Sequence, residues 1–383
     1  MAPVCARGAA RVPLAMLRDA AVEAYGLIVD GIGMPAPLVE HDRGRDGRLD
    51  LYVVDALPEG VEAYDGVAIG RGPLDLLSDR DAAPAFLLVD ANALGGGRCP
   101  LARGLAWGVA EASAAGVDVA ETRVVVDGLS RYLADLASGC APDHDAHARF
   151  EKAPFRALTA SAEGPHALAT WLDRTRSGGG GALVPALEGL ASQHAGLAFG
   201  PQEDGGEPTS AHFVNAIDLF DVLRETMKEQ HTTLDALLLD FTVARAFDPI
   251  AKPPLEWAVP ASTLPRRLLV SRGIEPTGAT YARVDLDGEP RPSGLEIELK
   301  WEIGASFRWA VLKLDAEGTK VGEVPVAMVE RLREIAVDVR HLEGAAAVLV
   351  VGWNAGDPEH PWAPDPPLTL PHGYEIAIYA EAP

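Results

Sequence analysis

Two histidines and one carboxylate are the residues of this chain that could hold a metal ion. His144 and His147 lie three positions apart, and Asp127 precedes them on a helical stretch. A zinc-dependent hydrolase typically uses two histidines four residues apart on one helix, with a glutamate between them that activates water. The sequence contains no H-E-x-x-H motif. Two interpretations stay open: a non-standard metal site formed with Asp127, and a pair of surface histidines.

The sequence contains no clear set of residues for nucleophilic catalysis. No G-x-S-x-G motif occurs, and Ser130 falls in the middle of an expected helix. Cys99 stands just before a helix, where the helix N-terminus could lower the pKa of a thiol. A disulfide with Cys140 would remove that thiol, so we expect no cysteine nucleophile.

A loop near the C-terminus combines tryptophans with acidic side chains and several prolines. Exposed aromatic rings beside carboxylates can bind a glycan or a protein, or form a calcium site. In the alternative interpretation, the tryptophans pack over the edge of a sheet and the prolines stiffen the loop. The candidate binding residues are Trp353, Asp357, His360, Trp362 and Asp365.

The segment from Cys99 to Cys140 is the part of the chain expected to organise the first domain. Apolar periodicity predicts two helices there, at 101–114 and 119–137. The two cysteines bracket this hairpin, so its ends can meet, and we expect a Cys99–Cys140 disulfide; free thiols remain the alternative. Around this segment we expect strands at 49–54 and 85–89 and helices at 10–29, 165–175, 182–194, 212–228 and 233–246.

The periodicity changes from helical to alternating after a proline-rich stretch. We therefore expect a domain at 1–250, a linker at 251–265 and a second domain at 266–383. The predicted fold class is α+β, with a mostly helical first domain followed by an antiparallel β-sandwich. The strands expected in the second domain are 268–270, 280–286, 295–303, 307–314, 335–339, 346–351 and 374–379.

Composition excludes some partners and leaves the compartment open. The 56 acidic and 33 basic residues give a net charge of -23, which opposes binding to nucleic acids and to anionic membranes. No apolar run is long enough for a transmembrane helix. The first residues do not have the pattern of a signal peptide, so either the protein stays inside the cell or a leader was removed before this numbering begins. Neither the composition nor the position of Cys5 assigns that cysteine a role.

Several motifs together resemble a group of myxobacterial-type exported proteins described as zinc metallopeptidases related to gluzincins. The matching segments are Asp46-Gly-Arg-Leu-Asp-Leu-Tyr-Val-Val-Asp55, Ala85-Phe-Leu-Leu-Val-Asp90 and the helix from Leu234 to Phe247. The tail is similar to a pre-peptidase C-terminal β-sandwich in Val348-Leu-Val-Val-Gly-Trp-Asn354 and Tyr374-Glu-Ile-Ala-Ile-Tyr379. The resemblance implies a peptidase-like first domain, a sandwich-like second domain and export.

The same resemblance implies that the zinc site has been lost. It places Trp107 and Glu111 where the two histidines belong, Gly108 at the catalytic glutamate, and Asp127 at the third ligand. An indole cannot replace a zinc-bound imidazole, and glycine offers no base. We therefore expect no cofactor and a non-catalytic, exported pseudopeptidase that binds a protein or glycan or serves as a scaffold. Two alternatives remain, an active metal-dependent hydrolase that uses His144, His147 and Asp127, and a cytoplasmic interaction protein with free thiols.

Overall fold

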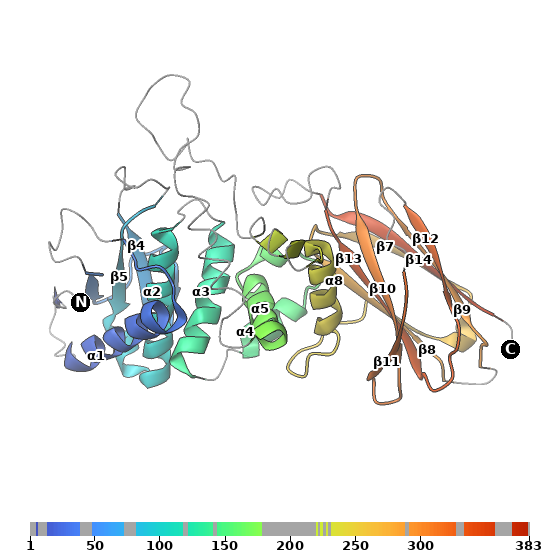
Figure 1. The fold of residues 1–383 in the computed structure, drawn as a ribbon, viewed down its shortest axis with the longest axis horizontal. Coiled ribbons are helices and arrows are strands. Elements are labelled where there is room, and N and C mark those ends of the chain that lie inside the picture. The colour runs from blue at the N-terminus through green and yellow to red at the C-terminus, as the bar shows by residue number, and fades with distance from the viewer. Residues whose placement is uncertain are drawn as a thin grey trace, which may run out of the picture. The chain divides into compact units, whose positions relative to one another are not determined.

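The chain folds into helices and several β-sheets, as the computed structural model in Figure 1 shows, and this confirms the α+β class. Contacts divide it into two compact units. Unit 1 comprises 1–142 and 165–226, and unit 2 comprises 143–164 and 227–383. The structure describes residues 5–6, 14–38, 48–72, 82–117, 122–140, 144–177, 220, 223–224, 227–228, 231–287, 291–326, 333–356 and 370–381.

Unit 1 contains a mixed five-stranded sheet in the order β1-β2-β5-β4-β3. β1 and β2 are parallel, as are β2 and β5, whereas β4 and β3 continue the sheet in antiparallel fashion. Sequence periodicity predicted β2 and β5 but missed the other three strands. The strands are β1 (Cys5–Ala6), β2 (Leu51–Val54), β3 (Ala63–Tyr64), β4 (Val67–Arg71) and β5 (Ala85–Asp90).

Helix α2 (Arg98–Ala115) packs against β4 and β5 of this sheet, and α1 and α3 both contact α2. Gly104 permits the close approach, because a Cβ atom there would lie only 2.8 Å from the backbone oxygen of Tyr64. The other helical segments are α1 (Leu14–Tyr25), a π-helical turn (Gly26–Ile32), a 3₁₀ turn (Ala91–Gly95), α3 (Arg123–Ser138), α5 (Glu163–Leu172) and a second π-helical turn (Asp173–Ser177).

Cys99 and Cys140 lie at disulfide distance, with their Cα atoms 5.9 Å apart and a sequence separation of 41. Cys99 is in the first turn of α2, and Cys140 follows the end of α3. The bridge therefore ties the start of one helix to the end of the next, as the sequence predicted.

Replacing both cysteines by alanine is expected to lower the free energy of unfolding by about 3 kcal/mol, because the bridge limits the entropy of the unfolded chain. Chemical denaturation of the wild-type and C99A/C140A proteins measures the difference. Thiol titration of the denatured, unreduced wild type should find one reactive cysteine of the three in the chain. Three reactive cysteines would contradict the bridge.

Unit 2 contains two sheets. The five-stranded sheet has the order β11-β10-β13-β8-β6, and the four-stranded sheet has the order β12-β9-β14-β7. All neighbouring pairs are antiparallel except β6 with β8. The strands are β6 (Trp257–Pro260), β7 (Arg266–Ile274), β8 (Ala279–Asp285), β9 (Leu295–Trp301), β10 (Phe307–Leu314), β11 (Lys320–Val324), β12 (Glu334–Val339), β13 (Ala347–Asn354) and β14 (His372–Ala380).

One hydrophobic cluster is built from the facing side chains of these two sheets. It includes Ile297 of β9, Ile376 of β14, Val311 of β10 and Val350 of β13, all fully buried. A second cluster lies on the other face of the five-stranded sheet, where Leu239 and Val243 of α8 (Leu234–Arg245) pack against β8, β10 and β13. β9 alternates between buried and more exposed positions because one of its faces packs in the core, whereas β13 is buried on both faces.

Some expectations differ from the structure or fall outside its described part. The expected linker contains β6, which pairs with β8, and β11 was not foreseen. The helix expected at 182–194 and most of that at 212–228 lie outside the described residues. The domain boundaries at 251–265 stay a prediction. Within the described ranges, no helix combines the length and the apolar character needed to cross a membrane.

Candidate functional site

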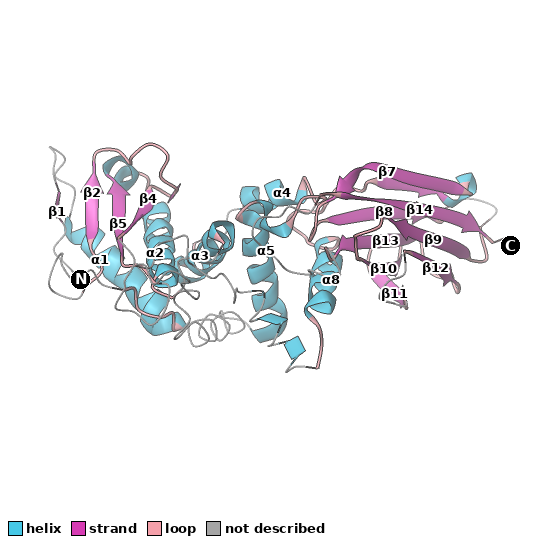
Figure 2. Cartoon of the chain, turned by 90° about the horizontal axis from the view of Figure 1, so that it is seen from above, coloured by secondary structure: helices cyan, strands magenta, loops and turns pink. Residues whose placement is uncertain are grey.

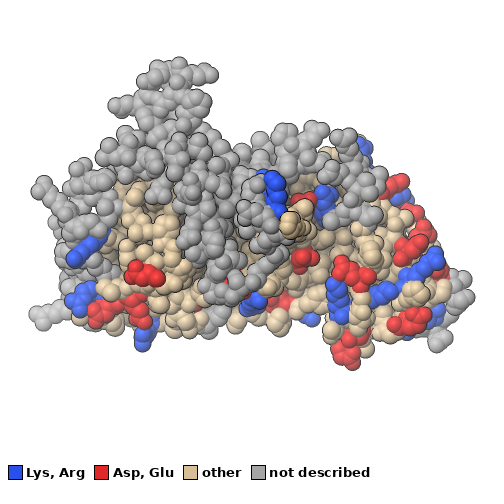
Figure 3. All heavy atoms as spheres, in the orientation of Figure 1, with Lys and Arg blue, Asp and Glu red and all other residues tan. Residues whose placement is uncertain are grey.

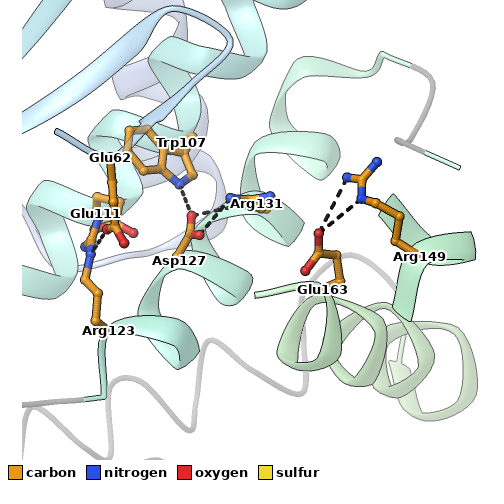
Figure 4. A network of polar contacts seen from close by, with 8 residues as sticks. All are labelled: Glu62, Trp107, Glu111, Arg123, Asp127, Arg131, Arg149 and Glu163. Carbon is orange, nitrogen blue, oxygen red and sulfur yellow. Dashed lines mark hydrogen bonds and ion pairs between the residues drawn. The ribbon is translucent and has the colours of Figure 1, made fainter. Parts of the chain in front are cut away.

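The four positions implied as a former zinc site lie on α2 and α3. Trp107 and Glu111 are one helical turn apart on α2, and their exposed fractions are 1% and 0%. Asp127 on α3 is 8% exposed and contacts Trp107. Figure 4 shows Trp107 and Asp127 directed toward each other and Glu111 directed toward Arg123. The structure therefore brings the three positions into a closed interior.

Asp127 is bound by two different donors. The indole Nε1 of Trp107 donates a hydrogen bond to its Oδ1 over 2.9 Å. Arg131, four residues along α3, donates from Nε and Nη2 to the two carboxylate oxygens over 3.0 and 2.8 Å. The Asp127 carboxylate is thus occupied by an indole and by a guanidinium, and its contact with Arg131 is the strong bidentate form of ion pair.

Glu111 faces two arginines from outside α2. Arg123 at the start of α3 donates to its Oε2, and Nη2 of Arg71 at the end of β4 lies 3.7 Å from the same oxygen. Its Oε1 is buried and has no hydrogen-bond partner among the described residues. We refer to Arg71, Trp107, Glu111, Arg123, Asp127 and Arg131 as the arginine–carboxylate cluster.

Burial raises the pKa of Glu111 from 4.5 to about 7, and the attraction of Arg123 opposes this shift only in part. Asp127 adds to the rise, because a second negative charge lies close by. Folding therefore favours the protonated acid over the carboxylate. At neutral pH this side chain is expected to exist in both protonation states.

The stability of unit 1 should fall as pH rises from about 4.5 to about 7. The folded protein binds the Glu111 proton more tightly than the unfolded chain, so this contribution is complete at low pH and is lost through the folded pKa. The change should amount to roughly 3 kcal/mol. Urea denaturation of wild type and E111Q across this range measures it. An equal pH dependence in both proteins would contradict the assignment to Glu111.

Tyr64 at the end of β3 forms one side of the cluster. Its ring lies 5.0 Å from the guanidinium carbon of Arg131 and 5.5 Å from that of Arg103, and its centroid is 6.1 Å from Trp107. Burial raises the pKa of the Tyr64 phenol, and the negative charge of Asp135 adds to the shift. The phenol therefore stays neutral and serves as a packing surface for two cations.

Gly108 stands at the position that the resemblance assigns to a catalytic glutamate, and it offers no base. A Cβ atom at this position would lie 2.9 Å from Cδ2 of Leu87 and 3.2 Å from Cγ1 of Val67. Both neighbours belong to strands of the sheet, so position 108 faces the apolar packing between helix and sheet. A general base placed there would enter this packing and lack solvent.

The two histidines of the alternative metal site have other surroundings. His144 is exposed at the start of α4 (His144–Glu151). Nε2 of His147 lies 3.7 Å from Oδ2 of Asp248. Across the described ranges, no three histidine, cysteine, aspartate or glutamate side chains come together as metal ligands would. The histidines are therefore not assembled into a ligand set in the part of the chain that is described.

Of the expected C-terminal binding loop, the structure describes residues 353–356, which include one candidate, Trp353. Trp353 belongs to β13 and is 1% exposed, so its indole is part of the interior and offers no binding surface. β13 lies between β10 and β8 and is buried along its whole length, which explains this burial. The other candidates, Asp357, His360, Trp362 and Asp365, lie outside the described residues.

Sequence reasoning missed the three arginines of the cluster. The spacing of Asp127 and Arg131 is the i,i+4 pattern of a helical ion pair, so this contact could have been found. Arg71 and Arg123 reach Glu111 from a strand and from a second helix. No local pattern connects those positions.

Comparisons with known proteins give little further information. No protein-family model matches the chain, and no curated protein matches it. One similar solved structure is the pre-peptidase C-terminal domain of a collagenase from Bacillus anthracis. It covers 33% of this chain and 98% of its own length, at 9% sequence identity and a TM-score of 0.22. A likeness at this level supports no argument about fold or function.

Proposed function

We propose that this chain is a non-catalytic binding or scaffold protein derived from an exported zinc peptidase. The observation that carries the proposal is the buried hydrogen bond from Trp107 to Asp127, at the two positions that the resemblance assigns to zinc ligands. In a zinc hydrolase this space must hold a cation and a water molecule. Here it is filled by an indole and by ion pairs.

The electrostatics of the cluster support the same conclusion. A catalytic zinc site keeps neutral imidazoles and carboxylates around the metal. In this chain Arg71, Arg123 and Arg131 bring three positive charges to Glu111 and Asp127. A divalent cation placed among three guanidinium groups would be repelled, so the cluster acts as a structural substitute for the metal.

The binding function in this proposal belongs to unit 2. Its two sheets and their common hydrophobic cluster fit an antiparallel β-sandwich, with a surface available to a protein or glycan partner. The Cys99–Cys140 pair supports export, because disulfides persist in oxidising compartments. The peptidase-like unit would then be a rigid support.

Metal and protease measurements on the purified full chain test the proposal. The protein is incubated with zinc chloride, freed of unbound metal and analysed for zinc by mass spectrometry. Casein cleavage is measured with and without 1,10-phenanthroline. We expect substoichiometric zinc and no cleavage. Stoichiometric zinc together with chelator-sensitive cleavage would overturn the proposal, and its loss in H144A/H147A would assign the metal to the two histidines.

A further inference from the structure

β7 forms one edge of the four-stranded sheet. In the described part of the chain it pairs only with β14, and Figure 2 shows it along the outer side of the sheet. The strand is nine residues long and contains no proline. Alternate residues of an edge strand direct their N–H and C=O groups away from the sheet, so β7 offers hydrogen-bonding groups to an added strand.

The charge of β7 is opposite to that of the chain. It carries Arg266, Arg267 and Arg272 and no acidic residue, whereas the whole protein has a net charge of -23. Arg267 pairs with Glu375 on β14, and Arg272 pairs with Glu256 at 2.6 Å. Arg266 is exposed and has no acidic partner among the described residues. Figure 3 shows basic and acidic side chains interspersed over the visible face of the sheets, so a strand without acids is a local feature.

A hollow of about 290 Å³ lies at the C-terminal half of β7. Val270, Arg272 and Ile274 of β7 line it together with the start of β8. Phe155 and Leu255 form part of its wall, and the Arg272 guanidinium carbon lies 3.9 Å from the centre of the Phe155 ring. The hollow combines apolar side chains with two cations, Lys152 and Arg272, and with the carboxylate of Glu256 at one end of the edge strand.

An apolar side chain is also exposed on β7. Leu269 is 69% exposed and stands between the arginines of this strand. A charged edge can simply prevent aggregation, but an exposed leucine weakens that protection. β7 thus combines an exposed leucine, arginines and backbone groups that pair with no strand in the described part of the chain. Such an edge suits a partner that supplies apolar and acidic side chains along an extended strand.

We propose that β7 is the docking edge for an extended acidic peptide, which adds to the four-stranded sheet as a further strand. Its carboxylates meet Arg266, and an apolar side chain further along the same face of the added strand enters the hollow beside Phe155. A second copy of this chain is a poorer occupant, because β7 pairing with β7 would place arginines against arginines. The inference rests on the proposed binding function and names the partner class.

Fluorescence anisotropy with synthetic peptides tests this docking. The probe is a labelled ten-residue peptide with glutamates in one half and valines in the other, so that both kinds of side chain occur on one face of the added strand. One matched peptide has lysine in place of glutamate, and another carries N-methyl groups on alternate amides, which removes strand pairing without changing charge. We expect the full chain to bind only the first. Equal binding of the N-methylated peptide would overturn strand addition in favour of simple charge attraction, and absence of binding would overturn the proposal.

Protein variants locate the site. Arg266→Glu should weaken binding of the acidic peptide by about ten-fold, whereas Arg266→Lys should preserve it. Lys320→Glu makes the same charge reversal on β11, an edge strand of the other sheet, and should leave affinity unchanged. Equal losses in the two reversals would contradict a site on β7. β7 contains no residue of the arginine–carboxylate cluster, so failure here and failure of the zinc test are distinguishable.

Discussion

Replacing Asp127 by alanine is expected to lower the free energy of unfolding by about 4 kcal/mol. The substitution removes the acceptor of the buried Trp107 indole and both hydrogen bonds from Arg131. It also leaves a partly buried guanidinium without its counter-charge. Urea denaturation gives the magnitude, and hydrogen exchange measured by mass spectrometry should show faster exchange in α2 and α3.

Two control variants test this expectation. One removes the charge of residue 127 and keeps its shape, and the other removes an exposed ion pair. Asp127→Asn keeps an acceptor for the indole and should cost less than the alanine variant. Asp19→Ala removes an exposed partner of Arg18 on α1, with the side chain 67% exposed, and should change stability by less than about 0.5 kcal/mol. If Asp127→Ala were as mild as Asp19→Ala, the cluster would not stabilise unit 1.

Replacing Arg245 by leucine is expected to cost about 4 to 5 kcal/mol, because it leaves Glu151 buried without its partner. Three hydrogen bonds of 2.9 to 3.2 Å join these side chains, which are 4% and 2% exposed. The guanidinium carbon also lies 4.3 Å from the centre of the Phe150 ring. The pair links α4 to α8 within unit 2, and denaturation monitored by circular dichroism measures its loss.

The matched control for this pair is Arg149→Leu on α4, the helix that carries Glu151. Arg149 is 53% exposed and reaches Glu163 over 3.4 Å, so its loss should cost less than about 1 kcal/mol. The double variant E151L/R245L should be more stable than R245L alone, since it leaves no unpaired buried charge. A double variant as unstable as the single one would show that packing, not charge, explains the effect.

Local patterns in the sequence predicted the elements that have a clear period. The apolar spacing of residues 101–137 gave α2 and α3, and the alternation after residue 266 gave most strands of unit 2. β3 has only two residues and β6 follows several prolines, so neither has a recognisable period. Short or irregular strands depend on their neighbours, which a local pattern does not contain.

The sequence indicated which positions to compare in the candidate site, but it did not indicate the arginines that bind the two carboxylates. The resemblance identified Trp107, Glu111 and Asp127 as positions on two neighbouring helices, and the structure places them together. The resemblance did not indicate that Arg123 and Arg71 reach Glu111, since these contacts join different helices and strands. The absence of an H-E-x-x-H motif could be recognised from the sequence, whereas the contacts around Trp107, Glu111 and Asp127 required the structure.

The Trp107 indole gives the most direct test of the proposal that this chain is a non-catalytic relative of zinc peptidases. Nuclear magnetic resonance of the full chain, with nitrogen-labelled tryptophan and assignment by W107F, follows its Nε1–H signal during a zinc titration. We predict slow exchange with solvent and no change at one equivalent of zinc, because Asp127 holds this proton in a closed interior. Rapid exchange, or a shift that saturates at one equivalent, would contradict the account.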